Sequence, residues 1–250
     1  MIDLQNFETP WDQERHRVPR EAEPIVYDDG DSVTLQFLIG EIQSAMCVSE
    51  PNTLVLTYTR VMAAFTILHN KPQRIAIIGL GGGSLPKWCY HQLPHSDITV
   101  VELNPKVIAL RDRFMVPPDN ERFRVLCGDG AEYVSARAES PDVLLVDGFD
   151  IDGQPPQLCS QDFYDSCYRM LHSDGLLVVN LCDHRRQQEL LTRIRRSFGD
   201  GVIVVTPEPA ENTIVFATKA ERVQANSVLP SQILKSLPRS LQFAPGLTLA

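Results

Sequence analysis

The sequence lacks the patterns that bind metals or form disulfide frameworks. Its six cysteines are scattered over 250 residues, with no CxxC pair and no clustered histidines. A structural zinc site needs closely spaced Cys and His ligands, and a disulfide-stabilised domain needs a higher density of cysteine. We therefore expect no metal site and six reduced, buried thiols, because free cysteine packs like a small hydrophobic residue.

Long apolar runs are missing as well. No stretch approaches the roughly 18 unbroken apolar residues of a membrane-spanning helix. The N-terminus, MIDLQNFETPWDQERHRVPREAEP, is polar and acidic, whereas a signal peptide is basic and then apolar. The sequence thus predicts a soluble, cytoplasmic protein with no membrane partner.

A basic charge balance is the third absence. The 23 Lys and Arg residues are outnumbered by 32 Asp and Glu residues, which gives a formal net charge of −9. Nucleic-acid-binding surfaces are normally basic, so we expect no nucleic-acid partner. The acidic balance is compatible with a cationic substrate, but it is also a common means of keeping a protein soluble.

The sequence does contain an alternation of short apolar runs and helical patterns from residue 74 onward. We predict strands at RIAIIG (74–79), DITVVE (97–102), RFRVLC (122–127), DVLLVD (142–147), GLLVVN (175–180), GVIVVT (201–206) and TIVFAT (213–218). Helices are expected over about 84–93, 105–114, 130–138, 160–171 and 184–198. Such an alternation is typical of a parallel sheet that helices cover on both faces.

The connection between the last two strands decides the fold class. It reads TPEPAENT (206–213), which leaves no room for a crossover helix, so these strands should form an antiparallel hairpin. Five helix-linked strands closed by a hairpin predict an α/β class I methyltransferase-like Rossmann fold. Its seven-stranded sheet is mostly parallel with an antiparallel last strand, and a small N-terminal β-segment precedes it.

We divide the chain into four parts. Residues 1–22 form a polar arm, and residues 23–70 form a small β-rich segment with a linking helix from about Tyr58 to His69. The strands expected in that segment are PIVYDD, SVTLQFLIG and TLVLTY. We expect residues 71–220 to form a Rossmann-like, nucleoside-binding catalytic domain and residues 221–250 to form a polar C-terminal tail.

A glycine cluster, GLGGGS (79–84), follows the first strand of the alternation. Glycines there let the backbone turn tightly and approach a ligand closely. Gly79 and Gly81 fit the first two positions of GxGxxG, and Ser84 stands at the third glycine. The cluster alone therefore leaves nicotinamide dinucleotide and S-adenosylmethionine open as ligands.

Successive strands end in Gly79, Glu102, Asp129 and Asp147. Ligands of open α/β sheets bind outside the carboxyl ends of the strands, and Glu102 stands where a carboxylate accepts both ribose hydroxyls. Adenosylmethionine folds place an acid or amide against the adenine where Asp129 stands, and they carry out their chemistry where Asp147 stands. A single acid after a strand often only caps the next helix, but the ordered set favours a ligand site.

With these residues identified, the chain resembles the spermidine synthase (polyamine aminopropyltransferase) family over roughly residues 25–219. The matching stretches are IGEIQSA, TYTRVM, IIGLGGGS, VVELNP, CGDGAEYV, VDGFDIDG and LCSQDFYDSCYRMLHSDGLLVV. The resemblance implies transfer of an aminopropyl group from decarboxylated S-adenosylmethionine to an amine or polyamine, with release of methylthioadenosine. It implies no tightly bound cofactor, and it implies a homodimer.

The resemblance also implies roles for individual residues. Asp147 is the expected proton acceptor, Asp150 is the second acid of a DxxD loop, and Tyr58 faces the amine. The residues expected to bind the nucleoside donor are Gln43, Gly79, Gly81, Ser84, Glu102, Leu103, Asp129 and Gly130.

The amine-binding half departs from the family pattern. The family cluster normally reads GGGDG, and its aspartate binds a cationic amine close to the sulfonium, whereas this chain has Ser84. Thr59, Asn180 and Glu208 also stand where the family has other residues. Since an aspartate would repel the carboxylate of whole S-adenosylmethionine and a serine would tolerate it, we hypothesise that Ser84 relaxes or reverses selection for the decarboxylated donor.

Four functions remain in order of preference. The first is a spermidine synthase-like transferase, and the second is an S-adenosylmethionine-dependent methyltransferase on the same fold. The third is a non-catalytic homologue that binds a nucleoside or polyamine, although retention of both Asp147 and Asp150 counts against it. The last, a nicotinamide dehydrogenase, would need a substrate domain beyond the sheet.

Overall fold

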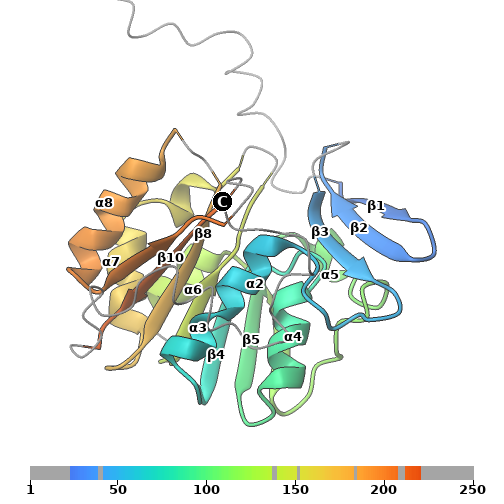
Figure 1. Ribbon diagram of the computed structural model, residues 1–250, viewed down its shortest axis with the longest axis horizontal. Coiled ribbons are helices and arrows are strands. Elements are labelled where there is room, and N and C mark those ends of the chain that lie inside the picture. Colours follow the sequence, from blue (N-terminus) through green and yellow to red (C-terminus); the bar gives the residue numbers. More distant parts are fainter. Residues whose placement is uncertain are drawn as a thin grey trace, which may run out of the picture.

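The computed structural model describes residues 23–38, 42–136, 140–150, 153–182, 185–207 and 212–220. Its centre is a seven-stranded sheet in the order β6-β5-β4-β7-β8-β10-β9 (Figure 1). The strands are β4 (Arg74–Ile78), β5 (Asp97–Glu102), β6 (Phe123–Cys127), β7 (Val143–Val146), β8 (Leu176–Leu181), β9 (Val202–Val205) and β10 (Thr213–Thr218). Strand β10 is antiparallel to β8 and β9, and the other neighbours are parallel. The predicted fold class and terminal hairpin are thus confirmed.

Helices cover both faces of this sheet, because its strands are apolar on both sides. In β4, Ile75 and Ile77 join one core and Ala76 and Ile78 join the other. The first core is covered by α2 (Thr57–Ala63), α3 (Phe65–Leu68) and α4 (Ser84–Gln92), and the second by α6 (Gly130–Ala136), α7 (Gln161–Met170) and α8 (Gln187–Phe198). The carboxyl ends of the parallel strands are left accessible between the two layers.

A small antiparallel sheet lies beside the large one, drawn in blue in Figure 1. It consists of β1 (Ile25–Asp28), β2 (Ser32–Gln36) and β3 (Ile42–Cys47) in that order. Leu35 and Met46 are buried and extend the first core to this sheet. Strand β3 packs against α4, so the small sheet lies next to the glycine turn.

The third strand of the small sheet was predicted in the wrong place. TLVLTY (53–58) is not a strand, whereas IQSAMC forms β3. The side chain of Arg60 accounts for this, because its Nε and Nη2 atoms donate to the carbonyl oxygens of Leu54 (2.6 Å) and Val55 (3.2 Å). These carbonyls are bound by a side chain in place of a neighbouring strand.

Two predicted helices are not continuous over the expected residues. The helix expected over 105–114 ends after α5 (Pro105–Ile108). The chain continues in turns up to Met115, whose φ is 53°, and their backbone hydrogen bonds span three or four residues. The helix expected from about Tyr58 is interrupted at Ala64 between α2 and α3. The remaining helices begin and end close to the predicted residues, with Ser160 capping α7 through a bond from the Phe163 amide.

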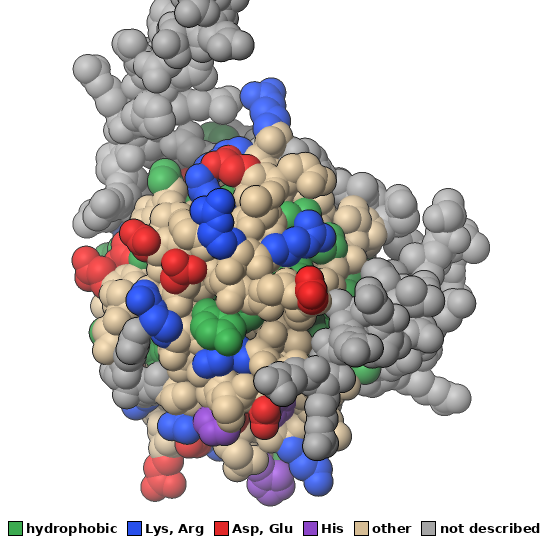
Figure 2. All heavy atoms as spheres, turned by 90° about the vertical axis from the view of Figure 1, so that its left-hand side faces the viewer, with side chains coloured by type: hydrophobic (Ala, Val, Ile, Leu, Met, Phe, Trp, Pro, Cys, Tyr) green, Lys and Arg blue, Asp and Glu red, His purple; other side chains and the backbone are tan. Residues whose placement is uncertain are grey.

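Several sequence-based expectations concern surface properties or residues that are not described. Cys89, Cys159 and Cys167 are buried as expected, but Cys47 and Cys182 are only half-buried and Cys127 is exposed at the end of edge strand β6. None of the helices in the described part of the chain combines the length and apolarity needed to cross a bilayer. Acidic and basic side chains are interspersed on the face shown in Figure 2.

Three sequence-based expectations concern residues outside the described part of the chain. They are the arm (1–22), the tail (221–250) and Glu208.

Candidate active site

The glycine turn brings the end of β4 against the end of β7. Gly79 has a φ of +98°, and a Cβ atom on it would lie 2.3 Å from the carbonyl oxygen of Asp147. Only glycine fits both the positive φ and the close approach. Gly81 and Gly83 also have positive φ values, and Gly83 precedes α4 as its N-cap. The turn therefore leads the chain over the sheet edge and directly into α4.

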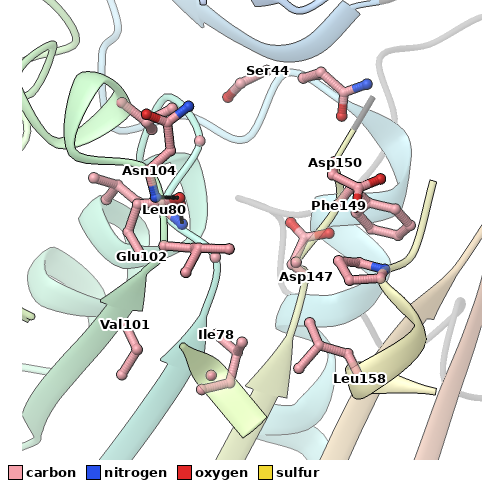
Figure 3. A pocket seen from close by; sticks show the side chains of 18 of the residues that line it. Ser44, Ile78, Leu80, Val101, Glu102, Asn104, Asp147, Phe149, Asp150 and Leu158 are labelled. Carbon is pink, nitrogen blue, oxygen red and sulfur yellow. Dashed lines mark hydrogen bonds between the residues drawn. The ribbon is translucent and has the colours of Figure 1, made fainter. Parts of the chain in front are cut away.

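A cavity of about 510 Å³ opens above these strand ends. Figure 3 shows Ile78, Val101 and Leu158 at its base, with Glu102 and Asp147 on opposite sides. All eleven residues that the sequence singled out line it, namely Gln43, Tyr58, Gly79, Gly81, Ser84, Glu102, Leu103, Asp129, Gly130, Asp147 and Asp150. Residues from the small sheet, α2 and the large sheet thus meet in one site.

Glu102, at the end of β5, is held by backbone amides. Its Oε2 accepts from the Leu80 amide and its Oε1 from the Asn104 amide, each at 2.8 Å. Burial raises the pKa of Glu102, while these amide donors act in the opposite direction. The backbone amides of Gly81 and Leu103 also lower its pKa, so four amides hold this carboxylate in the wall of the cavity, where a ligand can approach it.

Asp129 combines a capping function with a place in the cavity wall. Its Oδ1 accepts from the Ala131 amide (2.7 Å) at the start of α6, and its Oδ2 accepts from Gln157 Nε2 (3.4 Å). The general tendency of acids to cap helices therefore applies to this residue. Gln157, which sequence reasoning did not identify, also lines the cavity and reaches Asp129 from the loop after β7.

Asp147 lies at the end of β7 and is held by two side chains. Asn180 Nδ2 donates to its Oδ1 at 2.9 Å, and the Tyr58 hydroxyl donates to its Oδ2 at 3.3 Å. Burial raises the pKa of Asp147 to about 6, and the two hydrogen bonds limit the increase. Burial also raises the pKa of Tyr58 well above its ordinary value, so Tyr58 remains a phenol and a donor.

Ser84 is the first residue of α4 and faces the small sheet. Its Oγ lies 3.4 Å from Ser44 Oγ and 3.4 Å from the carbonyl oxygen of Ala45. Ser44, which the sequence analysis did not single out as a site residue, lines the cavity beside it. This end of the cavity is thus formed by two hydroxyl groups and the N-terminus of a helix.

A second cavity of about 560 Å³ adjoins the first. Gln43, Tyr58, Phe149 and Asp150 line both cavities. The other described residues around the second cavity are Ile42, Val55, Leu56, Thr57, Gly153, Asn180, Cys182, Pro207 and Asn212. Asp150 is the only charged side chain among its described lining residues, so this space suits a partly apolar molecule with one cationic group nearby.

The charges around the first cavity are all of one sign. Its described lining residues include four carboxylates, Glu102, Asp129, Asp147 and Asp150, and no Lys or Arg. Such a lining attracts a cation and opposes a pyrophosphate group. The cavity therefore does not suit the dinucleotide that a nicotinamide dehydrogenase would bind.

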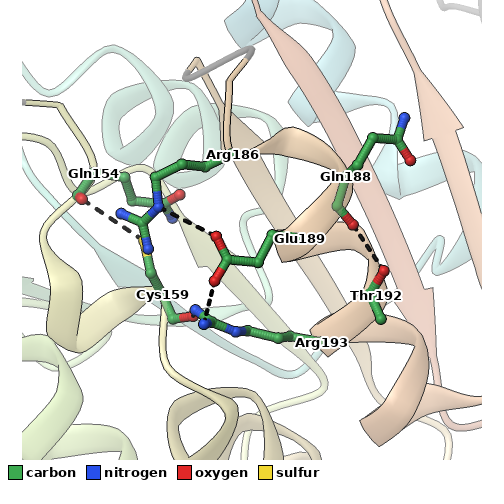
Figure 4. Close-up of polar contacts among 7 residues, drawn as sticks. All are labelled: Gln154, Cys159, Arg186, Gln188, Glu189, Thr192 and Arg193. Atoms are coloured by element: carbon green, nitrogen blue, oxygen red, sulfur yellow. Dashed lines mark hydrogen bonds and ion pairs between the residues drawn. The ribbon is translucent and has the colours of Figure 1, made fainter. Parts of the chain in front are cut away.

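Polar contacts from α8 hold the loop that closes one side of the first cavity (Figure 4). Arg193 Nη1 donates to the carbonyl oxygen of Cys159 at 2.7 Å. Glu189 pairs with both Arg193 and Arg186 and so restrains the Arg193 guanidinium. The loop ending at Cys159 supplies Pro155, Pro156, Gln157 and Leu158 to the cavity wall, so α8 helps to fix that wall from outside.

Comparison with known proteins shows which family this chain belongs to. A family model described as spermine/spermidine synthase domain matches residues 55–227. The polyamine aminopropyltransferase of Neisseria meningitidis serogroup A is 34% identical over 204 residues, which cover 80% of this chain and 78% of that protein.

Solved structures show the same fold. A probable spermidine synthase from Corynebacterium glutamicum superposes with a TM-score of 0.71 at 23% identity, covering 85% of this chain and 82% of that one. Human methyltransferase-like protein 13 in complex with SAH gives a TM-score of 0.61 at 22% identity, covering 77% and 91%. These two structural similarities show the fold. The match to the family model and the sequence identity with the Neisseria protein show that the chain belongs to the spermine/spermidine synthase family of transferases.

Proposed function

We propose that this protein transfers an aminopropyl group from decarboxylated S-adenosylmethionine to a small amine or polyamine. The observation that carries the proposal is the contact between Tyr58 and Asp147 beside the junction of the two cavities. The donor would occupy the first cavity and the acceptor the second. The reacting nitrogen and carbon would then meet next to a buried carboxylate.

The reaction needs positioning and the removal of a proton. The acceptor nitrogen attacks the carbon bound to the sulfonium sulfur, a C–N bond forms, and the C–S bond breaks with its electron pair going to sulfur. Methylthioadenosine leaves as a neutral thioether. The attacking nitrogen must give up a proton, since an alkylamine is an ammonium at neutral pH. No oxidant, metal or covalent enzyme intermediate enters this balance.

Asp147 would receive that proton. A carboxylate attracts the ammonium and orients it, and a buried carboxylate is a stronger base than an exposed one. Burial raises the pKa of Asp147 to about 6, which brings it nearer to the pKa of the amine and keeps it ionised at neutral pH. Asp150, which lines both cavities, would bind a cationic group of the acceptor.

The first cavity would hold the nucleoside. Glu102 would accept the ribose hydroxyls, Asp129 and Gly130 would face the adenine, and Gly79 and Gly81 would allow close approach of the ligand to the backbone. Gln43, Ser84 and Leu103 would complete the donor site. The four carboxylates of the lining suit a sulfonium cation.

Two measurements test the proposal. Thermal unfolding with decarboxylated S-adenosylmethionine, S-adenosylmethionine and NADH compares the donors, and a ligand at one hundred times its Kd adds about 2.7 kcal/mol of stability. For a chain of this size that raises Tm by roughly 5–10 °C. Mass spectrometry of reactions with a panel of amines then detects the transferred aminopropyl group.

Asp147→Asn is the decisive variant. We expect kcat to fall about 10²- to 10⁴-fold, which is the usual contribution of a general base, with little change in donor Kd. The exposed Asp174, at the opposite end of β8, gives the matched control Asp174→Asn, which should keep full activity. Wild-type kcat should fall below about pH 6, where Asp147 becomes protonated. Full activity in Asp147→Asn would disprove the assigned role.

A methyltransferase is the second candidate because Ser84 adds no negative charge at the N-terminus of α4. The positive end of a helix favours a carboxylate such as that of whole S-adenosylmethionine. Stabilisation by S-adenosylmethionine alone, together with methylated products, would replace the aminopropyl proposal. Stabilisation by either donor without any turnover would favour a non-catalytic binding protein.

A further inference from the structure

A chain of side-chain hydrogen bonds extends from Asp147 to the segment just before β10. Asn180, in β8, donates from Nδ2 to Asp147 Oδ1 at 2.9 Å. Its own Oδ1 accepts from Asn212 Nδ2 at 3.0 Å. Asn180 is 2% exposed and sits opposite Ile214 of β10, and Asn212 lies just before that strand, so the backbone holds the two amides close together.

The chemistry of Asp147 dictates the direction of this chain. An ionised carboxylate only accepts hydrogen bonds, so the amide nitrogen of Asn180 must face it. The amide oxygen of Asn180 then points away and needs a donor, which the nitrogen of Asn212 supplies. If Asn180 were rotated by half a turn about its last bond, its oxygen would face the carboxylate and favour the protonated acid.

We propose that Asn212 is a positioning residue that acts through Asn180 to keep the Asp147 carboxylate ionised and oriented. Asn212 does not touch Asp147 itself, but it selects the amide orientation that donates to it. The inference rests on the proposed function in one respect, which is that an ionised Asp147 is the form that accepts the proton. The hydrogen-bond chain itself exists whatever the reaction is.

Among the other described ionisable groups around Asp147, Tyr58 also favours the ionised carboxylate. Tyr58, from α2, supplies the second hydrogen bond to the carboxylate. Asp150 from the same loop, Glu102 from β5 and Asp129 after β6 line the same cavity, and their negative charges would favour protonation of Asp147. Cys182, after β8, lies close enough to Tyr58 to influence its pKa. Among these described groups, Asn180 and Tyr58 are the ones that favour the ionised acid.

The test is a double-mutant cycle read out as the pKa of Asp147. The probe is ligand-free protein with ¹³C-labelled aspartate carboxyl groups, in which the Asp147 signal is assigned by its loss in Asp147→Asn. Asn212→Asp replaces the donor by an acceptor and should turn Asn180 around, so we expect the pKa of Asp147 to rise by about one unit or more. Asn212→Leu removes the donor without adding charge and should give a smaller rise.

Repeating Asn212→Asp in an Asn180→Leu background separates the amide effect from simple repulsion between two carboxylates. If Asn212 acts through Asn180, the shift must be clearly smaller in that background. Thr213→Val is the matched control. It removes the 3.2 Å contact with the Thr206 hydroxyl in the same hairpin but leaves the hydrogen bonds from Asn212 to Asn180 and from Asn180 to Asp147 intact. It should leave the pKa of Asp147 unchanged.

Equal shifts with and without Asn180, or no shift in Asn212→Leu, would overturn the inference. Because the titration uses no substrate, it is independent of the proposed reaction. If the Asn212 variants shift the pKa of Asp147 but the protein transfers no aminopropyl group, the positioning role stands and the proposed function is refuted. If the protein transfers the aminopropyl group normally but the variants leave the pKa of Asp147 unchanged, the proposed function stands and the positioning role is refuted.

Discussion

An uncharged hydroxyl stands at position 84, where an acid would change which donor fits. Ser84 is the first residue of α4. Within the described part of the chain, its hydroxyl group has two hydrogen-bond partners, Ser44 Oγ and the carbonyl oxygen of Ala45. We expect Ser84→Asp to bring negative charge to the donor tail, favouring an amine there and repelling a carboxylate. The ratio of affinities for decarboxylated and whole S-adenosylmethionine should rise about 10- to 100-fold, or about 1.4–2.8 kcal/mol.

Isothermal titration with the two donors checks this prediction. Ser84→Ala is the control, because it removes the hydroxyl group without adding charge and should change both affinities alike. An unchanged donor ratio in Ser84→Asp would refute the hypothesis that this position selects the donor.

Gly79 is the residue whose replacement should disturb the site most directly. A methyl group there would meet the Asp147 carbonyl at 2.3 Å, and a φ of +98° is strained for alanine. We expect Gly79→Ala to lower the free energy of unfolding by about 2–4 kcal/mol and to abolish activity, because the end of β7 must move. Gly128→Ala, with open space around its Cβ, should cost far less in urea denaturation. Equal effects of the two substitutions would contradict the close-approach argument.

At the scale of elements, α8 supports a cavity wall that it does not itself line. Arg193 bridges from α8 to the Cys159 carbonyl, and Glu189 restrains it. We expect Arg193→Gln to cost about 1.5–3 kcal/mol of stability, as for hydrogen bonds to charged groups. Donor Kd should rise as the 153–159 loop loosens, while kcat at saturation stays within about twofold, because Asp147 is untouched.

Calorimetric binding and steady-state kinetics measure these two effects. Arg195→Gln is the control, since Arg195 lies exposed on the same helix. A loss of kcat without any change in donor binding would mean that α8 reaches the reaction centre by another route.

Helix α4 is tied to the turns after α5 by a buried lysine. Lys87 is fully buried and donates from Nζ to the Phe114 carbonyl oxygen at 2.7 Å. Burial lowers the pKa of Lys87 to about 8. Between pH 8 and the ordinary lysine pKa of about 10.4, the unfolded chain therefore binds more protons than the folded one, and stability rises with pH.

Urea denaturation at pH 7.5 and 9.5 measures this effect. We expect Lys87 to add about 2 kcal/mol of stability over that interval, and Lys87→Met should remove the gain. Buried thiols such as Cys89 have raised pKa values and act in the opposite direction, so the difference between wild type and variant is the informative quantity. The same pH dependence in both proteins would contradict the burial of a protonatable amine.

For the whole molecule, the large sheet could be predicted because its buried parallel strands are continuous apolar runs. Their ends carry glycines and acids, and the carboxyl ends of parallel strands meet, so the lining of the first cavity followed from chain order. The third strand of the small sheet could not be predicted, because Arg60 binds the carbonyls of an equally apolar segment. Asn212 and Gln157 were also missed, since only the folded loops bring them to Asn180 and Asp129.

The two adjoining cavities, with four lining residues in common, constrain the kinetics of the whole enzyme. Because neither cavity must empty before the other fills, both substrates would be bound together before any bond breaks. We expect intersecting lines in double-reciprocal plots and no exchange of label between donor and methylthioadenosine when the acceptor is omitted. Parallel lines would instead mean that the group rests on the protein between two half-reactions. Direct transfer would also invert the configuration of the migrating carbon, which a chirally deuterated donor would record.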